Sequence, residues 1–371
     1  MFKVQKSGKI LSRLKWKFIL LLSLFCISSS FANSIDRPKI GLVLSGGGAK
    51  GFAHIGTLKM LDSLQIPIDY IVGTSMGGIA GALYAIGYNG HDQENLIHRS
   101  DWQEIFSDNP PRTELPYFVR KETGRYQLEF GINGLKPVTP SGLIFGQKVS
   151  LLFSSLTFPY EKINDFDKLP IPFRCVAVDL VTGNQVVLKG GSLAKAMRAT
   201  MAIPTVFSPV EWGDSLLVDG GISNNLPIDV AKKMGADIVI AVDVESPLKK
   251  RDELNTALSI LEQTIRMLGI EQRQKNEKLA DIHIRPDLTG FTTGDFENKK
   301  IKKIVQRGIE AAHNNIDQFV ALKNKHHLHR MEDPTILDLA NKHPRIFDLQ
   351  ITGHTALPFS FIYEQLNIKP A

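Results

Sequence analysis

Ser75 lies within the pattern Gly-x-Ser-x-Gly, between a β-branched run that ends at Val72 and a helix-like run that begins at Ile79. A strand, this pattern and a helix in succession form the sequence signature of a nucleophile elbow. Small residues around the serine let the backbone bend sharply and lift the hydroxyl clear of the sheet, at the positive end of the following helix. Because five-residue patterns recur by chance, an ordinary glycine-containing turn is an alternative at this point.

A glycine-rich loop precedes the serine by one helix and one strand. Residues 46–51 are Gly-Gly-Gly-Ala-Lys-Gly, between an apolar strand at 39–45 and a helix predicted from Phe52. Consecutive N–H groups in such a loop can point toward one anion, and the helix N-terminus adds positive potential. The loop is therefore suited to hold the oxyanion that forms when a serine attacks an ester, with Lys50 fixing the loop or adding positive charge.

The same loop also fits a dinucleotide-binding pattern, Gly-x-Gly-x-x-Gly, through Gly46, Gly48 and Gly51. That interpretation requires an acidic residue at the end of the second strand, where it would hold a ribose. Asp69 stands before this strand, and the strand ends in the serine turn instead. The sequence therefore counts against a nucleotide-binding enzyme, which is kept as an alternative function.

The residue that would act as the base toward the serine decides between a Ser-His-Asp triad and a two-residue dyad. A Ser-His-Asp hydrolase of the α/β type places its acid and then its histidine after the serine. None of the later histidines lies in a glycine-rich loop after an apolar strand, whereas Asp219 does, between the run 216–218 and Gly220-Gly221. A carboxylate can take the serine proton directly in a two-residue dyad. Asp-Gly-Gly is also a common turn, so this motif alone does not decide the matter.

Taken together, the segments 46–51, 73–77 and 219–221 closely resemble the patatin-like phospholipase family in order and spacing. The resemblance spans roughly residues 38–325. It implies a three-layer α/β/α fold with a mostly parallel central sheet, and hydrolysis of acyl esters in phospholipids, lysophospholipids or neutral lipids. It also implies a Ser-Asp dyad that works without histidine, metal or cofactor.

The resemblance assigns a role to each matching residue. Ser75 is the expected nucleophile and Asp219 the expected proton acceptor. The N–H groups of Gly46, Gly47 and Gly48 are expected to line the oxyanion hole. The supporting motif residues are Lys50, Gly51, Gly73, Gly77, Gly220 and Gly221.

The elements that must position these residues alternate along the chain. Apolar runs predict strands at 39–45, 69–72, 173–178, 186–188, 216–218, 238–242 and 283–284. Helices are predicted at 52–61, 79–85, 193–201, 227–234, 254–280 and 299–322. Repeated strand-turn-helix units indicate a parallel α/β sheet. Residues 90–165 are less regular but rich in aromatic and aliphatic side chains, which would either pack against the sheet or form an apolar cover that meets lipid.

The first 32 residues have the form of a secretory signal peptide, with a basic start, an apolar run at 18–27 and a small-x-small site that ends at Ala32. These residues carry six Lys/Arg and no Asp/Glu, which accounts for the whole formal charge of +6. The pI of 9.1 therefore gives no reason to expect nucleic acid. We expect export to the periplasm, outer membrane or medium, with a signal anchor as the alternative.

Cys175 would be the only cysteine left after cleavage, so no internal disulfide is expected. It lies in the apolar run 173–178, where a buried small hydrophobe is the simplest interpretation. Cysteines are too few for a zinc site, and the histidines lack ligand spacing. No metal and no cofactor are therefore expected.

The end of the chain is predicted to be separate from the hydrolase domain at 38–325. A charged linker at 326–344 leads to residues 345–371, which resemble the start of a polypeptide-transport-associated repeat. In some bacterial patatin-like proteins such a repeat belongs to an outer-membrane autotransporter type; an incidental strand and helix is the alternative. The expected partners are an acyl-ester lipid and a membrane surface, and a homodimer is left open. A non-catalytic envelope assembly module is the third function class.

Overall fold

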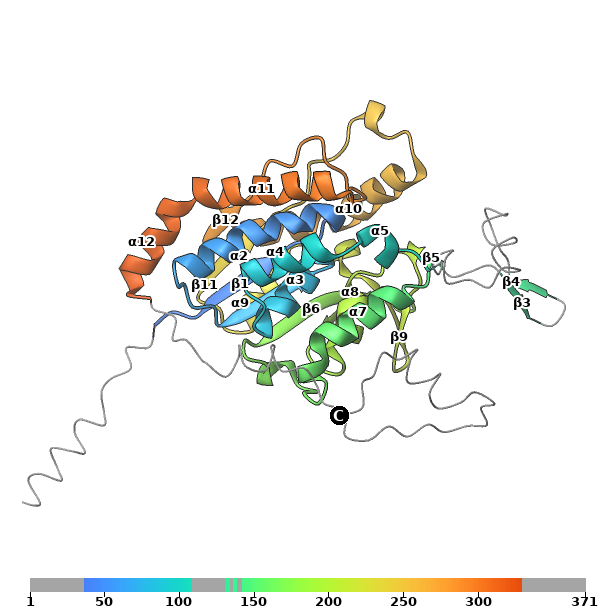
Figure 1. Ribbon diagram of the computed structural model, residues 1–371, viewed down its shortest axis with the longest axis horizontal. Helices are drawn as coiled ribbons and strands as arrows, with labels where there is room; N and C mark the ends of the chain where they lie inside the picture. The colour runs from blue at the N-terminus through green and yellow to red at the C-terminus, as the bar shows by residue number, and fades with distance from the viewer. Residues whose placement is uncertain (1–36, 109–130, 134–135, 139–141, 329–371) are drawn as a thin grey trace, which may run out of the picture.

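The computed structural model describes residues 37–108, 131–133, 136–138 and 142–328 (Figure 1). Its main sheet has the strand order β12-β11-β1-β2-β6-β10-β9, and β7 pairs with β6. The first five strands of that order are parallel to their neighbours, whereas β7, β9 and β10 are antiparallel. The mostly parallel sheet predicted from the sequence is therefore confirmed.

The strands of the main sheet are β1 (Ile40–Leu44), β2 (Tyr70–Thr74), β6 (Phe173–Asp179), β7 (Gln185–Leu188), β9 (Val210–Trp212), β10 (Ser215–Asp219), β11 (Ile238–Val242) and β12 (Ile282–Ile284). Two small sheets pair β3 (Gly131–Asn133) with β4 (Lys136–Val138), and β5 (Gly142–Ile144) with β8 (Thr205–Phe207). Every residue of β1 is buried, as expected for a central parallel strand covered on both faces.

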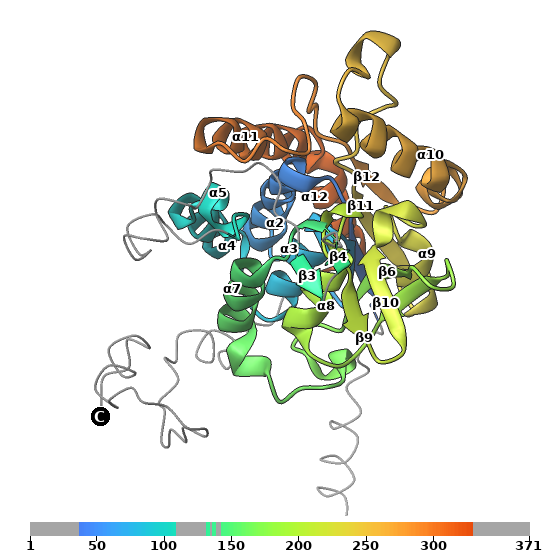
Figure 2. The same cartoon turned by 90° about the vertical axis from the view of Figure 1, so that its right-hand side faces the viewer.

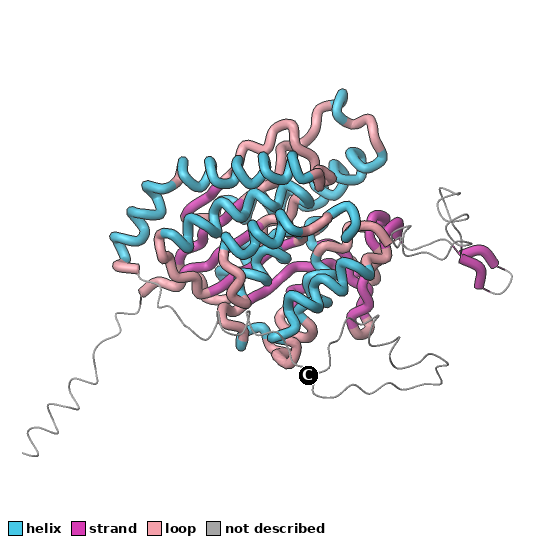
Figure 3. Tube along the Cα trace, in the orientation of Figure 1, coloured by secondary structure: helices cyan, strands magenta, loops and turns pink. Residues whose placement is uncertain are grey.

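The helices are α2 (His54–Ser63), α3 (Met76–Ala85), α4 (Gly90–Arg99), α5 (Trp102–Ile105), α7 (Gln147–Thr157), α8 (Leu193–Thr200), α9 (Ile228–Lys233), α10 (Ala257–Glu277), α11 (Asn298–Asn314) and α12 (Ile316–His326). Short 3-10 turns are η1 (Gly48–Ala53), η2 (Phe158–Tyr160), η3 (Phe166–Lys168), η4 (Gly220–Ile222) and η5 (Arg251–Glu253). The strands run between two helical layers (Figure 3).

Alternation along β1 divides the core between these layers. Leu42 and Leu44 belong to the larger apolar cluster, which includes residues of α2, α3, α8 and α11, whereas Val43 packs with α9 on the opposite face. Figure 2 shows α2, α3 and α7 on one side of the strands and α9 and α10 on the other. Side chains of a strand point alternately to its two faces, so one apolar run holds both layers.

Two predicted helices differ from the structure. The helix predicted from Phe52 is preceded by the 3-10 turn η1, which begins at Gly48. The single helix predicted at 299–322 is two helices, because α11 ends at Asn314 and α12 begins at Ile316. The predictions for residues 1–32 and 345–371, and for the part of the linker beyond Leu328, fall outside the described residues.

Candidate active site

The serine turn follows the carboxyl end of β2. Ser75 has φ 54° and ψ −126°, and α3 starts at the next residue without a side-chain cap. Positive φ in a residue with a side chain is strained and is concentrated at functional sites. The N–H of Ser75 donates to the Thr200 hydroxyl at 3.0 Å, which holds this backbone in place. Ser75 is 6% exposed.

Strand register brings Asp219 to the same level as the serine. Thr74, the residue before Ser75, pairs with Val176 of β6, and the next residue, Ala177, pairs with Asp219 on its other side. β10 is antiparallel to β6, so the chain of β10 reaches this level from the direction opposite to that of β2. The sequence predicted the meeting of Ser75 and Asp219 but not the antiparallel approach.

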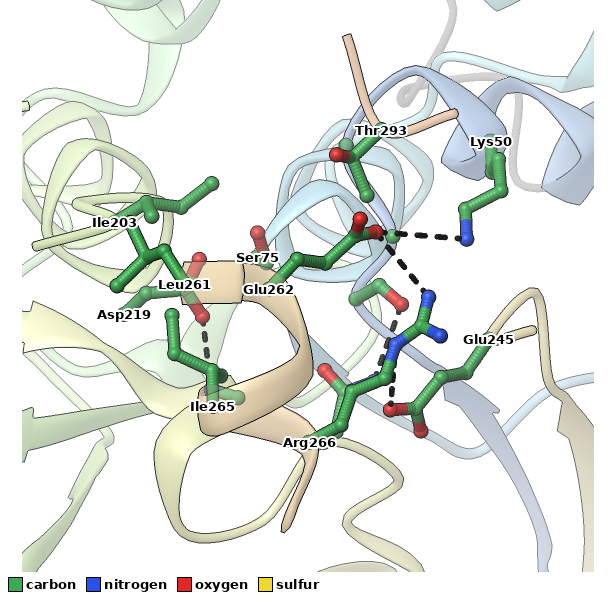
Figure 4. Close-up of a pocket in the computed structure, with 15 residues that line it drawn as sticks. Lys50, Ser75, Ile203, Asp219, Glu245, Leu261, Glu262, Ile265, Arg266 and Thr293 are labelled. Atoms are coloured by element: carbon green, nitrogen blue, oxygen red, sulfur yellow. Dashed lines mark hydrogen bonds and ion pairs between the residues drawn. The ribbon is translucent and has the colours of Figure 1, made fainter. Parts of the chain in front are cut away.

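Asp219 is a buried carboxylate, 5% exposed. Burial raises its pKa to about 6, while hydrogen bonds from the Gly221 N–H and the Ser75 hydroxyl act in the opposite direction. The Gly221 N–H donates to Oδ1 at 2.8 Å. In Figure 4, Leu261 and Ile265 of α10 gather with Ile203 beside this carboxylate. Apolar neighbours disfavour the charged form of an acid, which accounts for the direction of the shift.

A cavity of about 80 Å³ opens over both residues (Figure 4). It is lined by Gly46, Gly47, Gly48, Lys50, Ser75, Ile203, Asp219, Gly221, Asn225, Glu245, Leu261, Glu262, Ile265, Arg266 and Thr293. The three sequence motifs therefore meet in one place. Four predicted supporting glycines, Gly51, Gly73, Gly77 and Gly220, are absent from this lining; each has another atom within 2.4 Å of where a Cβ would stand.

The three N–H groups that were predicted to line the oxyanion hole differ in their contacts. The N–H of Gly46 donates to the Asn225 carbonyl at 3.3 Å, so this group is already engaged. Within the described part of the chain, no acceptor is recorded for the N–H groups of Gly47 and Gly48. Both residues line the cavity with Ser75. Donors that face a reacting group without a protein acceptor are what an oxyanion hole needs.

Asn225 is a site residue that the sequence patterns did not reveal. Its side-chain Nδ2 donates to the Gly46 carbonyl at 3.2 Å, in addition to the backbone bond between the same two residues. The neighbouring Asn224 carbonyl accepts the Thr74 hydroxyl at 2.8 Å. The segment that follows the aspartate turn thus holds both the glycine loop and the serine turn. Two successive asparagines shortly after Asp219 were the only available signal.

Lys50 is 1% exposed. Its Nζ donates to the Ser246 hydroxyl at 2.9 Å and lies 3.9 Å from the Glu262 carboxylate of α10. Burial lowers the pKa of Lys50 to about 8, and the nearby Arg266 adds to the effect. Of the two predicted roles, the contacts favour fixing the loop, because the ammonium is committed to Ser246 and Glu262.

No histidine described in the structure lines either cavity that contains Ser75. His54 begins α2 directly after the turn that contains the glycine loop, but its Nε2 donates to the Ser45 carbonyl at 2.8 Å. Burial lowers the pKa of His54 to about 4, so the ring is neutral at physiological pH. Among the described residues, no group of three or more His, Cys, Asp or Glu is placed to hold a metal ion.

A second cavity, of about 190 Å³, also reaches Ser75. It shares Gly48, Ser75, Ile203 and Thr293 with the first. The rest of its lining is apolar apart from glycine: Met76, Ile79, Phe106, Ile144, Met201, Val206, Phe207, Gly294 and Phe296. Ser75 therefore stands where a charged cavity and an apolar cavity meet.

Comparison with known proteins identifies a family that matches the chain. The family model described as patatin-like phospholipase matches residues 42–232, just over half of the chain. The chain belongs to the patatin-like phospholipase family. The patatin-like α/β fold expected from the sequence is thereby confirmed, while the wider domain bounds of 38–325 stay a prediction.

Curated relatives of this patatin-like chain are much longer proteins. The lysophospholipase NTE1 of Debaryomyces hansenii is 31% identical over 220 residues, which is 58% of this chain and 12% of that protein. Human patatin-like phospholipase domain-containing protein 6 is 33% identical over 228 residues, 59% of this chain and 14% of the relative. An NTE family protein of Mycobacterium tuberculosis is 33% identical over 215 residues, 58% of this chain and 32% of the relative.

Solved structures overlap with the patatin-like chain at low scores. VipD from Legionella pneumophila has a TM-score of 0.43 and 14% identity, and the match covers 76% of this chain and 67% of that one. The type III effector ExoU has a TM-score of 0.37 and 12% identity, with 76% and 53% covered. These scores are too low to support a comparison of the sites.

Proposed function

We propose that this protein hydrolyses acyl esters of lipids, with Ser75 as the nucleophile and Asp219 as the base. The observation that carries the proposal is a serine held at φ 54° beside a buried carboxylate whose pKa is raised to about 6. Such a carboxylate is mostly deprotonated at neutral pH, yet basic enough to accept a proton in the transition state. Membership of the patatin-like phospholipase family supports the same chemistry.

In this mechanism the Ser75 hydroxyl attacks the ester carbonyl while Asp219 accepts its proton. The bond to the alcohol then breaks, Asp219 returns the proton to the leaving alcohol, and the acyl group stays on Ser75. A water molecule attacks this acyl-enzyme with Asp219 again as the base. Release of the fatty acid returns a proton to the serine oxygen.

We assign the oxyanion hole to the N–H groups of Gly47 and Gly48. They line the cavity beside Ser75, and the N-terminus of α3 adds partial positive charge at the same point. In serine hydrolases one such donor is worth about 10²–10³-fold in rate. Gly46 has a supporting role here, because its N–H is bonded to Asn225.

Hydrolysis of a fluorogenic fatty-acyl ester by the full chain tests the dyad. Ser75→Ala and Asp219→Asn should abolish fatty-acid release, whereas His91→Ala and His98→Ala should retain most of it. A histidine variant as inactive as Ser75→Ala would rule out the dyad. Fluorophosphonate labelling that disappears in Ser75→Ala would exclude a non-catalytic assembly module, which should show neither labelling nor turnover.

Phospholipids and lysophospholipids are the substrates that we infer, because lysophospholipases and phospholipase-domain proteins are among the relatives. Mass spectrometry of the products formed from a mixed lipid extract, with Ser75→Ala as the control, would identify the lipid class. Release of fatty acid only from neutral lipids would contradict this choice of substrate and leave the dyad intact.

We also propose that the face over the site meets a membrane surface. α10 lines the catalytic cavity through Leu261 and Ile265. On the same helix Ile260, Met267 and Leu268 are 53, 59 and 66% exposed. Large apolar side chains exposed beside a site for lipids favour contact with lipid. Among the described residues, no helix combines the length and apolar character that a membrane crossing needs.

Sedimentation with phosphatidylcholine vesicles tests this surface. The pair Met267→Ser and Leu268→Ser should reduce the bound fraction several-fold. Leu279→Ser is the matched control, because Leu279 is 43% exposed but lies just before β12. Since β12 is parallel to β11, Leu279 is at the amino-terminal end of the parallel strands, whereas Ser75 is at their carboxyl end. Equal losses in both variants would contradict a surface centred on α10.

Export is our proposal for the whole chain, and it rests on residues 1–32. Protein recovered from the envelope or medium of a bacterial host should begin at Asn33, which its intact mass would show. Recovery only from the cytoplasm with Met1 in place would contradict export. The resemblance at 345–371 favours the outer-membrane type, and fractionation of the envelope would test it.

A further inference from the structure

We infer that the apolar cavity receives the acyl chain of the substrate and that Phe106 and Phe296 form its end wall, which sets the longest chain the enzyme accepts. This inference rests on the proposed ester hydrolysis at Ser75. It adds a specificity-determining pair of residues to that function.

The position of the aromatic pair follows from the two cavity linings. Residues common to both cavities mark the end where they meet, and Ser75 is one of them. Phe106 and Phe296 line the apolar cavity but not the charged one. Both residues therefore belong to the apolar side of the junction, the side that an acyl chain would occupy when its carbonyl carbon is at Ser75.

The wall is a pair of rings in direct contact. The centroids of Phe106 and Phe296 are 4.5 Å apart. Phe207, which lines the same cavity, lies 5.9 Å from Phe106 in an edge-to-face arrangement. Phe207 is itself held by the guanidinium of Arg198, 5.1 Å from its ring. Aromatic pairs at these separations attract one another beyond their burial.

Buried aromatic residues support the wall from behind. Phe52 and Trp102 are 3% and 8% exposed. The Phe52 ring is 6.0 Å from Phe296, and the Trp102 ring is 5.8 Å from Phe106. The Trp102 indole N–H donates to the Ile97 carbonyl at 3.1 Å. Phe296 and Trp102 also line a separate polar cavity of about 330 Å³, so the pair divides apolar space from polar space and a longer chain would have to displace it.

The size of the cavity agrees with a length limit. Its volume of about 190 Å³ is below the roughly 300–1,000 Å³ of pockets for drug-sized ligands. Its lining offers an acyl chain no charged group, and burial of each methylene is favourable until the wall is reached. One acyl chain of limited length fits the apolar cavity, and the alcohol portion of the ester would lie in the charged cavity.

Steady-state kinetics of the full chain on p-nitrophenyl esters from C4 to C16 tests the inference. For the wild type, kcat/KM should rise about fourfold per added methylene and then stop rising at one chain length. Phe106→Ala and Phe296→Ala should each increase the chain length at which kcat/KM stops rising by two or more methylenes. Val206→Phe, which fills the same cavity, should decrease that chain length.

Phe158→Ala is the matched control, because Phe158 is 47% exposed and lines neither cavity. In this variant kcat/KM should stop rising at the same chain length as in the wild type. If kcat/KM stops rising at the wild-type chain length in all three cavity variants while Ser75→Ala is inactive, the end wall is contradicted and the proposed hydrolase function stands. Esterase activity that survives in Ser75→Ala would instead overturn the proposed function, and the inference with it.

Discussion

The N–H of Ser75 donates to the Thr200 hydroxyl at 3.0 Å, and the same hydroxyl donates to the Val176 carbonyl at 2.5 Å. Thr200 is completely buried at the end of α8. One side chain therefore joins the strained backbone of Ser75 to β6, the strand that also pairs with Asp219. We regard Thr200 as a positioning residue for the proposed dyad.

Thr200→Val should lower kcat with little change in KM. The change keeps the shape of the side chain but leaves the buried Ser75 N–H without its acceptor, which costs about 1–3 kcal/mol. If this free energy is lost from the conformation in which Ser75 reacts, kcat should fall by up to about a hundredfold. Thr200→Ser keeps the hydroxyl and should recover most of the rate.

Thr157→Val is the matched control for this prediction. The Thr157 hydroxyl is buried and donates to the Phe153 carbonyl within α7, and it lines neither cavity at Ser75. It should lose some stability and keep wild-type kcat. A Thr200→Val enzyme with wild-type kcat would show that the hydrogen bond is structural only.

The pH dependence of kcat/KM should have an acid limb near pH 6. Asp219 acts as a base only when deprotonated, and burial raises its pKa to about 6. The rate should fall about tenfold per pH unit below that value and level off above it. Ile265→Asn places a polar group beside the carboxylate and should move the limb to lower pH. A wild-type limb at pH 4 would contradict the raised pKa.

The three motifs taken together, through their resemblance to the patatin-like family, predicted that Ser75 and Asp219 would meet; their catalytic roles stay a prediction. Asp219 reaches the level of Ser75 because the register of the antiparallel strand β10 pairs Asp219 with Ala177, the residue after the partner of Thr74, and this register was not predicted. Thr200 and Asn225 could not be predicted in this way, because their contacts join segments 125 and 179 residues apart. The bond that engages the Gly46 N–H was missed for the same reason.

One helix boundary was missed because neither glycine nor proline marks it. α11 and α12 are separated at Asn315, where a helical pattern continues without a breaker. The helical propensity of asparagine is only moderately low, so nothing in the sequence favoured a stop there. The strand order of the main sheet also depends on long-range packing, which periodicity alone does not specify.

Asp219→Asn should be inactive but more stable than the wild type at pH 8. The pKa of Asp219 is 3.8 in its ordinary state and about 6 in the folded protein. The unfolded chain therefore releases the proton first, and the native state loses stability as the pH rises from about 4 to 6. Asparagine removes this loss, so the difference in Tm between variant and wild type should shrink as the pH falls toward 4.

Asp229→Asn provides a control of opposite sign. Burial alone would raise the pKa of Asp229, but hydrogen bonds from Asn224 and Lys233 outweigh it and lower the pKa. Ionised Asp229 therefore stabilises the fold, and Asp229→Asn should have a lower Tm than the wild type at pH 8. Equal shifts in both variants would show that removal of a charge, and not the environment of Asp219, causes the effect.

Gly48→Ala should lose activity by more than backbone strain alone explains. Gly48 has φ +54°, and a Cβ there would stand 2.4 Å from the Thr293 carbonyl oxygen, so the loop would have to move. Gly213 has φ +59° and no atom within 4 Å of its Cβ position. Both substitutions should cost about 1–2 kcal/mol of stability from the left-handed backbone, measured by chemical unfolding, and Gly48→Ala should cost more because of its close contact with Thr293. Only Gly48→Ala should lower kcat, by roughly the 10²–10³-fold that one oxyanion donor is worth; equal kcat in the two variants would remove Gly48 from the oxyanion hole.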